Sequence, residues 1–413
     1  MNQPARILAA LLIGLALGIA GGRFGWALAV NVADPIGSIW IDALRMTVVP
    51  LVVALLVTGI LRTAGQSRGG GLALKAVLFF VALLWLSTLI SAFLTPALLA
   101  AWPLGTASRA ALDSAMGQAP AVTTSAPPLG DFIRSIVPTN PLSAAVNDAM
   151  LPLIVFTTLF ALAAVRLEEG ARATLENLFS AIEQAMLTIV GWVLWIAPLG
   201  VFALAFVLGA RAGTAAIGAL AHYIAIVSAA GLAAWALAYP VALLGARVRL
   251  GAFIRAVAPA QIVALSTQSS LATLPTMLKC CERLGVPVAV AGVPLPIAVA
   301  IFRVTSPAMN LAVAIYVAHL TGTPLSAATI AAGAVVAGTT TLGTISLPGQ
   351  VSFLTSTTPI ALAMGVPLAP LGLLLAVEMI PDLVRTVGNV TMDVAATTAL
   401  ARHEGALDAS TGA

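Results

Sequence analysis

TTTLGTISLPGQVSFLTSTTP, residues 339–359, places a Gly/Pro turn in the middle of an apolar segment rich in Ser and Thr. The segment lies within residues 304–377, a run of 74 residues that contains no Asp, Glu, Lys or Arg. Two continuous apolar helices fit that length, but Gly and Pro at the centre favour two half-helices joined by a polar tip. Residues 264–277, ALSTQSSLATLPTM, have the same character. We therefore expect two re-entrant helical hairpins. The alternative for either segment is an ordinary span kinked by Pro, with Ser and Thr bonded to their own helix carbonyls.

The composition indicates the environment of the chain. Of the 413 residues, 60% are hydrophobic and 8% are charged, whereas a soluble domain carries roughly 25% charged residues. Such a chain cannot cover a surface that faces water, so we expect an integral membrane protein. The net charge of +4 is too small, and the Lys and Arg too scattered, for a nucleic-acid partner. Two adjacent cysteines, Cys280 and Cys281, and three widely separated histidines indicate neither a disulfide framework nor a metal centre.

Apolar stretches long enough for membrane helices, about 20 residues, occupy most of the first 245 positions. They lie near 6–24, 38–61, 74–102, 146–165, 177–209 and 217–245. The first stretch is expected to be a retained helix, and the polar residues 104–140 are expected to form one external loop. With the N-terminus inside, twelve Lys and Arg face the cytoplasm and four face the outside. This asymmetry predicts a multi-pass plasma-membrane protein with both termini in the cytoplasm.

The last apolar span carries a polar stripe. Five residues recur there at spacings of 4, 3, 4 and 4: Glu378, Asp382, Arg385, Asn389 and Asp393. At about 100° per residue they share one face of a helix, with Thr386 at its edge. Each charge costs ~2.5–3.5 kcal/mol if it faces lipid, so the stripe faces protein or water and marks a substrate or ion path. An ion-pair ladder is the alternative; it explains Arg385 with Asp382 or Glu378 and leaves Asn389 and Asp393 unexplained.

Two more polar residues precede the stripe. Asn310, in RVTSPAMNLAVA, follows a Pro within an apolar span, which predicts an unwound helix with free carbonyls at that position. Arg303 lies seven residues earlier and is predicted to share the same face two turns away. It either reaches the cytoplasmic interface with its charged end or has a buried role.

These residues resemble those of the dicarboxylate/amino acid:cation symporters, the family that includes the glutamate transporters. DLVRTVGNVTMD, 382–393, is similar to the family's D-x-x-R-T-x-x-N-V-x-x-D in its last helix. SSLATLP, 269–275, and LPGQVS, 347–352, resemble the tips of its two hairpins. The similarity runs over nearly the whole chain, from ALRMTVVPLVVALLVTGI at 43–60 to the last span.

The resemblance implies roles for individual residues. Arg385 would bind the side-chain carboxylate of the substrate, and Asp382 would bind its ammonium group. The main-chain carboxylate would be held by four further residues: Thr386 and Asn389, with Ser269 and Ser270 at the first tip. Leu347 and Val351, in the second tip, would form the outer gate. Oxygen ligands for one sodium ion would come from Ser306, Asn310, Asn389 and Asp393.

One departure from the family concerns coupling. The family reads Asn-Met-Asp-Gly-Thr where this chain has Asn310, Leu311 and Ala312, so a carboxylate of a second cation site is missing. Arg303 adds a positive charge nearby. We therefore expect fewer coupled sodium ions, with protons carried by Glu378 or Asp382 supplying the rest of the drive.

The expected fold is an all-α membrane protein with eight transmembrane helices, two re-entrant hairpins and inverted repeats, and residues 1–413 form a single transporter. By resemblance, about 1–70 and 140–212 form a scaffold that trimerises, and about 71–105 and 213–402 form a moving transport part. Residues 403–413 are expected to be a cytoplasmic tail. The expected function is symport of an acidic amino acid with sodium or protons by an elevator-like mechanism, with no other cofactor and no enzymatic activity. A C4-dicarboxylate symporter and an anion channel are the alternatives.

Overall fold

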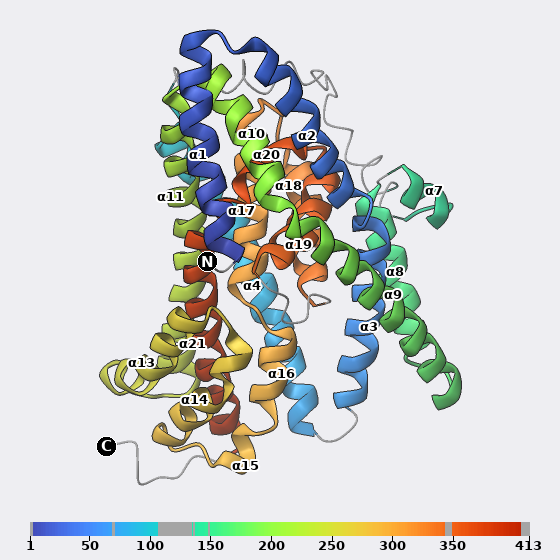
Figure 1. The fold of residues 1–413 in the computed structure, drawn as a ribbon. Helices are drawn as coiled ribbons and strands as arrows, with labels where there is room; N and C mark the ends of the chain where they lie inside the picture. Colours follow the sequence, from blue (N-terminus) through green and yellow to red (C-terminus); the bar gives the residue numbers. More distant parts are fainter. Residues whose placement is uncertain are drawn as a thin grey trace.

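The computed structural model describes residues 3–67, 71–105, 134, 137–147, 149–342 and 349–405, and within them it is helical without strands. The first half contains α1 (Gln3–Phe24), α2 (Ala27–Arg45), α3 (Val48–Ser67), α4 (Gly71–Ala101), α7 (Pro141–Val146), α8 (Met150–Ala164), α9 (Glu169–Trp195), α10 (Ala197–Ala212) and α11 (Ala215–Ala236). The second half contains α12 (Ala238–Pro240), the π-helical turn η1 (Val241–Gly245), α13 (Leu250–Thr267), α14 (Ser270–Arg283), α15 (Val288–Ala291), α16 (Pro294–Ile301), α17 (Thr305–Leu320), α18 (Ala327–Thr341), α19 (Gly349–Ala363), α20 (Ala369–Leu374) and α21 (Met379–His403). Figure 1 shows this order from blue to red.

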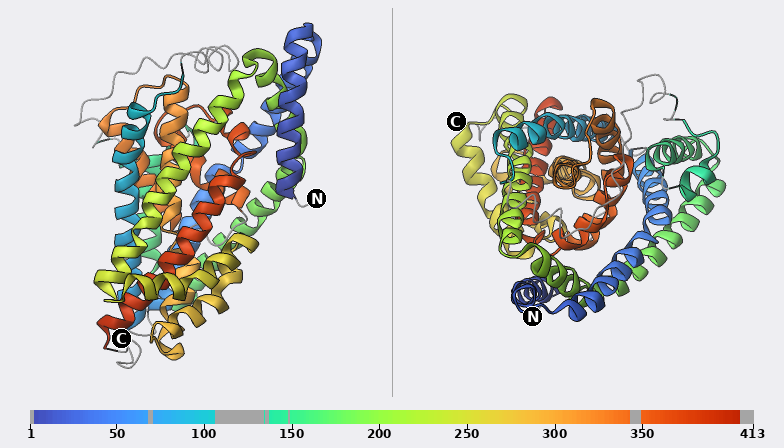
Figure 2. Two further views of the ribbon diagram at one scale, coloured as in Figure 1. Left: turned by 90° about the vertical axis from the view of Figure 1, so that its left-hand side faces the viewer. Right: turned by 90° about the horizontal axis from the view of Figure 1, so that it is seen from above.

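The helices fall into two groups in space. Seen from above in Figure 2, α1, α2, α3, α8, α9 and α10 follow one another in an arc beside a compact bundle. The bundle contains α4 together with α11 and the helices that follow it. Within it, α17 packs against α4, α11, α18, α19 and α21. Apart from His319, every residue of α17 is buried, as expected for a helix that other helices surround on all sides.

The arc is held together by unusually close backbone packing between its first and last helices. α1 carries glycines at three positions spaced by four residues: Gly14, Gly18 and Gly22. Facing them are three backbone carbonyls of α10, on Phe202, Phe206 and Ala210, which a Cβ at these glycines would overlap. Small residues spaced by four let two membrane helices approach until their backbones touch.

Two spans that the sequence predicts as continuous are each broken in two. The stretch 38–61 is divided between α2 and α3, and 177–209 is divided between α9 and α10. Pro50 is the third residue of α3, and Pro198 is the second residue of α10. Pro fits the first turn of a helix, where its missing N–H has no partner to lose. Each Pro therefore begins a new helix here, where the prediction of one long span is wrong.

The first interrupted segment forms two helices around a short turn. α13 ends at Thr267, Gln268 adopts a left-handed conformation (φ 51°), and α14 begins at Ser270 and packs against α13. Both cysteines of the chain lie on α14 with free, buried thiols. The second segment contributes α18 and α19, which also pack together. Its tip, residues 343–348 with Leu347, lies outside the described residues. That these helix pairs are re-entrant stays a prediction.

Within the described ranges, four helical segments are long and apolar enough to cross a membrane: 74–101, 169–195, 216–245 and 294–320. Shorter apolar helices include 9–24, 49–62 and 250–265. The segment 294–320 is largely buried inside the protein, whereas the other three expose most of their residues. This pattern is that of an integral membrane protein in which lipid-facing helices surround a buried core. The predicted external loop falls mostly on residues outside the described ranges.

Candidate functional site

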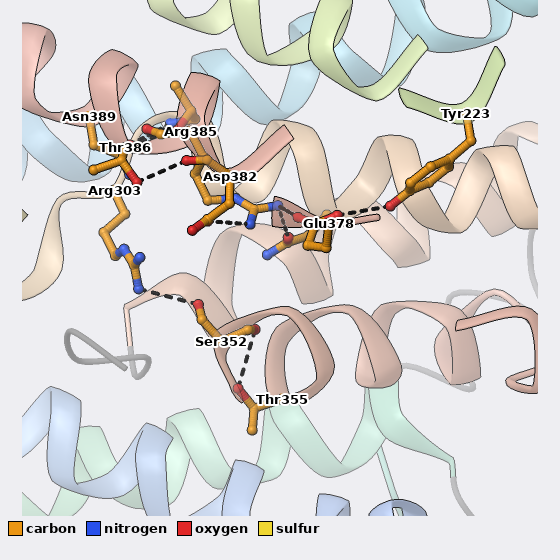
Figure 3. Close-up of polar contacts among 11 residues, drawn as sticks. Tyr223, Arg303, Ser352, Thr355, Glu378, Asp382, Arg385, Thr386 and Asn389 are labelled. Carbon is orange, nitrogen blue, oxygen red and sulfur yellow. Dashed lines mark hydrogen bonds and ion pairs between the residues drawn. The ribbon is translucent and has the colours of Figure 1, made fainter. Parts of the chain in front are cut away.

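The guanidinium of Arg385 is the centre of a buried polar cluster on α21 (Figure 3). Its Nη2 forms an ion pair with Glu378 Oε1 at 2.6 Å, and its Nη1 donates to Asp382 Oδ1 at 2.9 Å. Nη2 also donates to Asn310 Oδ1 on α17 at 3.3 Å. The hydroxyl of Tyr223, on α11, donates to the other oxygen of Glu378 at 2.9 Å. Arg385 thus links α21 to α17, and Glu378 links it to α11.

This cluster is built by the spacing of its residues on the helix. Glu378 is the last residue before α21, Asp382 lies in its first turn, and Arg385 follows at i+3. All three are buried; Arg385 and Glu378 are each 1% exposed. Two carboxylates share one guanidinium, so the trio carries a net charge of −1 when all three groups are ionised. The ion pairs expected of an ion-pair ladder, Arg385 with Asp382 and Arg385 with Glu378, are present. The net negative charge of the trio is buried inside the protein.

The non-helical junction between α16 and α17 lies beside the cluster. Asn389 Oδ1, on α21, accepts hydrogen bonds from the backbone N–H of Thr305 at 3.0 Å and from its hydroxyl at 2.8 Å. A side chain of α21 therefore caps the first turn of α17, where backbone N–H groups have no helical partner. The break occupies residues 302–304, and Asn310 lies within regular helix. The prediction of an unwound helix at Asn310 is wrong, because Pro307 lies in the first turn of α17, where it interrupts no helical hydrogen bond.

Two serines of α4 donate hydrogen bonds to backbone carbonyls of the junction and of the first turn of α17. Ser87 Oγ donates to the carbonyl of Val304 at 2.7 Å, and Ser91 Oγ donates to the carbonyl of Ala308 at 2.6 Å. Sequence reasoning missed Ser91, as well as Thr305 and Tyr223. The available signal was weak: each is a hydroxyl residue in an otherwise apolar span, which also fits a side chain bonded to its own helix.

The end of the stripe at Asn389 and Asp393 is different, because several of its polar atoms have no hydrogen-bond partner among the described residues. Both carboxylate oxygens of Asp393 are buried without a hydrogen-bond partner, and so is the hydroxyl of Ser306. Asn389 has an unpartnered Nδ2, although its oxygen is engaged. Buried carboxylates are ordinarily paired or bound to a cation. The unpartnered oxygens of Asp393 and Ser306 are of the kind that bind hard cations.

Arg303 lies in the junction itself, between Phe302 and Val304. Its partly buried side chain donates from Nη1 to Ser352 Oγ on α19 at 3.3 Å, as Figure 3 shows. Because the helix is interrupted at residues 302–304, Arg303 does not lie two turns from Asn310 on one continuous helix, as predicted. Of its two predicted alternatives, the contact with Ser352 favours the role inside the protein.

The remaining predicted site residues have no described side-chain contact with the guanidinium of Arg385. Thr386 is buried, but its hydroxyl donates to the carbonyl of Asp382 one turn earlier. Ser269 caps α14, where its hydroxyl accepts from Ala272 N–H at 3.2 Å, and Ser270 is the first residue of that helix. Val351 belongs to the first turn of α19. The side-chain contacts described here therefore unite Glu378, Asp382, Arg385 and Asn310. Thr305 joins Asn389 to this group, because its hydroxyl also donates to the backbone carbonyl of Arg385 at 2.9 Å.

Comparison with known proteins relates the chain to membrane transporters. The chain is 28% identical to the proton/glutamate-aspartate symporter of Escherichia coli (strain K12), over 98% of this chain and 93% of the relative. It is also 28% identical to C4-dicarboxylate transport protein 1 of Pseudomonas paraeruginosa (strain DSM 24068 / PA7), over 96% and 89% of the two chains. The same identity relates it to the C4-dicarboxylate transport protein of Rhodospirillum rubrum, over 98% and 88%.

The relatives are transporters of small molecules in a lipid bilayer, so the expectation that the chain is not an enzyme is confirmed. The expected resemblance is confirmed as well, because the profile of the sodium:dicarboxylate symporter family matches residues 4–403. The chain belongs to the sodium:dicarboxylate symporter family.

Proposed function

We propose that this protein is a secondary active symporter that imports an acidic amino acid, glutamate or aspartate, with sodium ions or protons. The observation that carries the proposal is the buried guanidinium of Arg385 held between two carboxylates. A guanidinium can bind a substrate carboxylate through two parallel hydrogen bonds. Asp382, three residues away on the same face, supplies a negative charge for a substrate ammonium group. The name of the Escherichia coli relative agrees with this substrate class.

The charge of the cluster favours an amino acid over a dicarboxylate without an amino group. The ionised trio of Glu378, Asp382 and Arg385 has a net charge of −1. Glutamate and aspartate also carry −1, and their ammonium group can lie against Asp382. A C4-dicarboxylate carries −2 and would place a second carboxylate near Asp382, where like charges repel strongly in a poorly solvated site. The names of two relatives nevertheless make C4-dicarboxylate symport the second candidate.

Substrate binding requires a rearrangement of Arg385. Both outer nitrogens of its guanidinium are engaged by protein oxygens, and its Nε has no described partner. A substrate carboxylate therefore replaces Glu378 or Asn310 as partner of Nη2. Glu378 keeps the hydroxyl of Tyr223 when Arg385 turns away. A carboxylate left in that position takes up a proton more readily, which makes Glu378 the proposed proton carrier.

Asp393 is the proposed centre of the sodium site, with oxygens from Ser306, Asn310 and Asn389 as further ligands. The unpartnered carboxylate oxygens of Asp393 and the unpartnered hydroxyl of Ser306 support this assignment. The side-chain oxygens of Asn310 and Asn389 already accept hydrogen bonds from Arg385 and Thr305. Those two residues would therefore contribute backbone carbonyls, or turn their amides when the ion binds.

The two groups of helices suggest how the site moves. We propose that the arc, about residues 1–70 and 140–212, is a static scaffold of a homotrimer in the plasma membrane, with both termini cytoplasmic. The bundle, about 71–105 and 213–402, would carry the site across the membrane in an elevator-like motion, within a fold of eight spans and two re-entrant hairpins. Ser269 and Ser270 would add donors from the first tip, and Leu347 and Val351 would form the outer gate at the second.

The test is uptake of labelled aspartate, glutamate and succinate into proteoliposomes, with sodium and proton gradients imposed separately. The expected result is saturable uptake of aspartate or glutamate above its equilibrium level, driven by at least one gradient. Preferential accumulation of succinate would replace the proposal with the second candidate. Flux that neither saturates nor rises above equilibrium under either gradient would indicate an anion channel and overturn the proposal.

A further inference from the structure

Thr305, the first residue of α17, is fully buried and bonded to α21 through both its backbone and its side chain. Its backbone N–H donates to Asn389 Oδ1 at 3.0 Å. Its hydroxyl shares one proton between the same Oδ1, at 2.8 Å, and the backbone carbonyl of Arg385, at 2.9 Å. Because Arg385 and Asn389 are about one helical turn apart, a single threonine contacts the turn of α21 that carries both side chains.

These contacts determine which way the amide of Asn389 faces. A backbone N–H is always a donor, so the amide atom that meets the N–H of Thr305 must be the oxygen. The NH2 group of the same amide therefore lies on the far side of Cγ from Thr305. A flipped amide would place donor against donor and leave a buried N–H without an acceptor, which is costly. Two donors on one oxygen thus fix the orientation of the amide.

The packing around Thr305 keeps its side chain in this position. Gly388 precedes Asn389 on α21, and a Cβ at Gly388 would lie 2.5 Å from Thr305 Cγ2 and 3.0 Å from Trp235 Cβ on α11. A contact of 2.5 Å is shorter than Cβ atoms tolerate, so only glycine admits Thr305 this close to α21. The methyl group of Thr305 is therefore held by packing, and its hydroxyl is held by hydrogen bonds.

The orientation of Asn389 leaves one donor for a ligand. Its Nδ2 is buried and has no hydrogen-bond partner among the described residues. An amide NH2 group cannot bind a cation, so the partner that it lacks is an acceptor. An acidic amino acid carries two carboxylates, and in the proposed function the guanidinium of Arg385 takes one of them. The other is the acceptor that suits Asn389 Nδ2.

We propose that Thr305 is a positioning residue of the transport site, which holds the oxygen of Asn389 so that the amide presents its NH2 group to the second carboxylate of the substrate. The inference rests on the proposed function and deepens it by naming the residue that orients this donor. A donor that is held in place before binding loses little conformational freedom when the substrate arrives. Thr305 therefore raises the affinity for substrates with two carboxylates without touching them. The side chain of Asn389 is assigned to the substrate, and its backbone carbonyl is the oxygen that it offers to sodium.

The first test is binding of aspartate and of β-alanine to purified protein, compared between wild type and Thr305→Val. β-Alanine keeps an ammonium group but has a single carboxylate, which Arg385 takes, so its affinity does not depend on Asn389. Valine has the shape of threonine without the hydroxyl and removes one of the two bonds on Asn389 Oδ1. Aspartate affinity is expected to fall about 3- to 10-fold, while β-alanine affinity stays at the wild-type value. An unchanged ratio of the two affinities would overturn the proposal.

Two variants serve as controls for this ratio. Thr305→Ser keeps the hydroxyl and is expected to retain the wild-type ratio; the same fall as in Thr305→Val would assign the effect to packing and overturn the proposal. Thr398→Val removes another buried hydroxyl of α21, which donates to the carbonyl of Val394 in its own helix at 2.7 Å. The ratio should stay unchanged in Thr398→Val, and an equal fall there would refute a specific role of Thr305.

A second test determines whether Thr305 acts through Asn389. Aspartate affinity is measured for wild type, Thr305→Val, Asn389→Ala and the double variant, as a double-mutant cycle. In the Asn389→Ala background there is no amide left to orient, so Thr305→Val is expected to cause no further loss of affinity. A loss as large as in the wild-type background would mean that Thr305 supports the site by another route, and it would overturn the proposal.

A third measurement needs no substrate and keeps the inference separate from the proposed function. The melting temperatures of the same proteins form another double-mutant cycle. Because both single changes remove the same hydrogen bond, the double variant is expected to lose less than the sum of the two single losses. Additive losses would overturn the coupling between Thr305 and Asn389. Failure of the wild type to bind acidic amino acids would reject the proposed function, while this cycle still tests whether Thr305 holds Asn389.

Discussion

The contact between α1 and α10 and the contact between α17 and α21 join helices in opposite ways. In the first, three glycines bring two backbones together so closely that no Cβ fits between them. In the second, Arg385 and Asn389 reach across to Asn310 and Thr305, and several polar atoms remain without partners. Membrane helices associate by either route, because burial of apolar surface drives little when the surroundings are lipid.

The difference teaches which part can rearrange. A glycine contact has one close-packed arrangement, and any displacement loses the contact or creates overlap. A polar contact with unused donors and acceptors has alternative partners, so a substrate or ion can replace an internal bond at little net cost. The α1–α10 contact is therefore suited to a fixed frame, and the α17–α21 contact is suited to a site that exchanges ligands.

Arg385→Ala breaks the polar contact at its centre and has the largest expected effect. Uptake of aspartate and glutamate should be lost, because two buried carboxylates then face the substrate carboxylate without a counter-charge. Breaking a buried ion pair from one side also costs about 3–5 kcal/mol of stability. Proteoliposome uptake and melting temperature measure the two effects. Arg211→Ala serves as the control, because Arg211 of α10 also forms an ion pair, to Asp34 of α2 at 2.8 Å, but at an exposed position. Undiminished uptake by well-folded Arg385→Ala protein would contradict the assignment.

Asp382→Ser separates the two substrate candidates within the same contact. The hydroxyl cannot balance a substrate ammonium, so aspartate affinity should fall roughly 10- to 100-fold, the loss expected for a hydrogen bond to a charged group. Succinate has no ammonium and should bind equally well or better. Competition binding with both ligands gives the answer. Equal losses for aspartate and succinate would indicate that Asp382 serves only as a partner of Arg385.

Gly18→Ala tests the glycine contact between α1 and α10. One methyl group would overlap the carbonyl of Phe206 on α10, and overpacking costs about 1–3 kcal/mol. The matched control is Gly191→Ala on α9, where a Cβ meets no neighbour and a gain of about 0.5–1 kcal/mol is expected. Melting temperatures should therefore move in opposite directions. A fall of equal size in both variants would show that the α1–α10 contact is not specially close.

Tyr223→Phe has the smallest expected effect, because Glu378 keeps its ion pair with Arg385 when the hydroxyl is lost. The expected cost is about 1 kcal/mol, the usual value for one hydrogen bond. Tyr239→Phe is the control, since that ring packs edge-on against Phe253. A difference in melting temperature between the two variants measures the bond to Glu378; no difference would mean that Glu378 does not depend on it.

The sequence was sufficient for the polar stripe but not for the helix breaks. Spacings of 4, 3, 4 and 4 place Asp382, Arg385 and Asn389 on one face whatever surrounds the helix, so their proximity follows from helical geometry alone. The position of each break depends on whether the helix ends before a proline or begins beside it. The sequence predicts that Pro307 disrupts a helix, but Pro307 lies in the first turn of one, as Pro50 and Pro198 do. The missing N–H of Pro disfavours a helix interior but suits a first turn. The neighbouring residues in the sequence do not show which of these two positions a proline occupies.

The contacts between distant segments were beyond the sequence for a related reason. Ser87, Tyr223 and Ser352 are ordinary hydroxyl residues in apolar stretches, and nothing local distinguishes a bond to their own helix from a bond to another. Their partners, Val304, Glu378 and Arg303, lie 217, 155 and 49 residues away in the chain. Tertiary packing alone selects such bonds.

The two buried cysteines of α14 have a practical consequence for chemical labelling. They are the only sulfhydryl groups in the sequence, and Cys280 and Cys281 are 1% and 0% exposed. A water-soluble maleimide should therefore react slowly with the folded wild-type protein. A single cysteine placed at Thr267, which is exposed beside the turn between α13 and α14, would become the fastest-reacting thiol without removal of the native pair. The rate at which that position is modified, with and without substrate, then reports directly on when the tip is open to water.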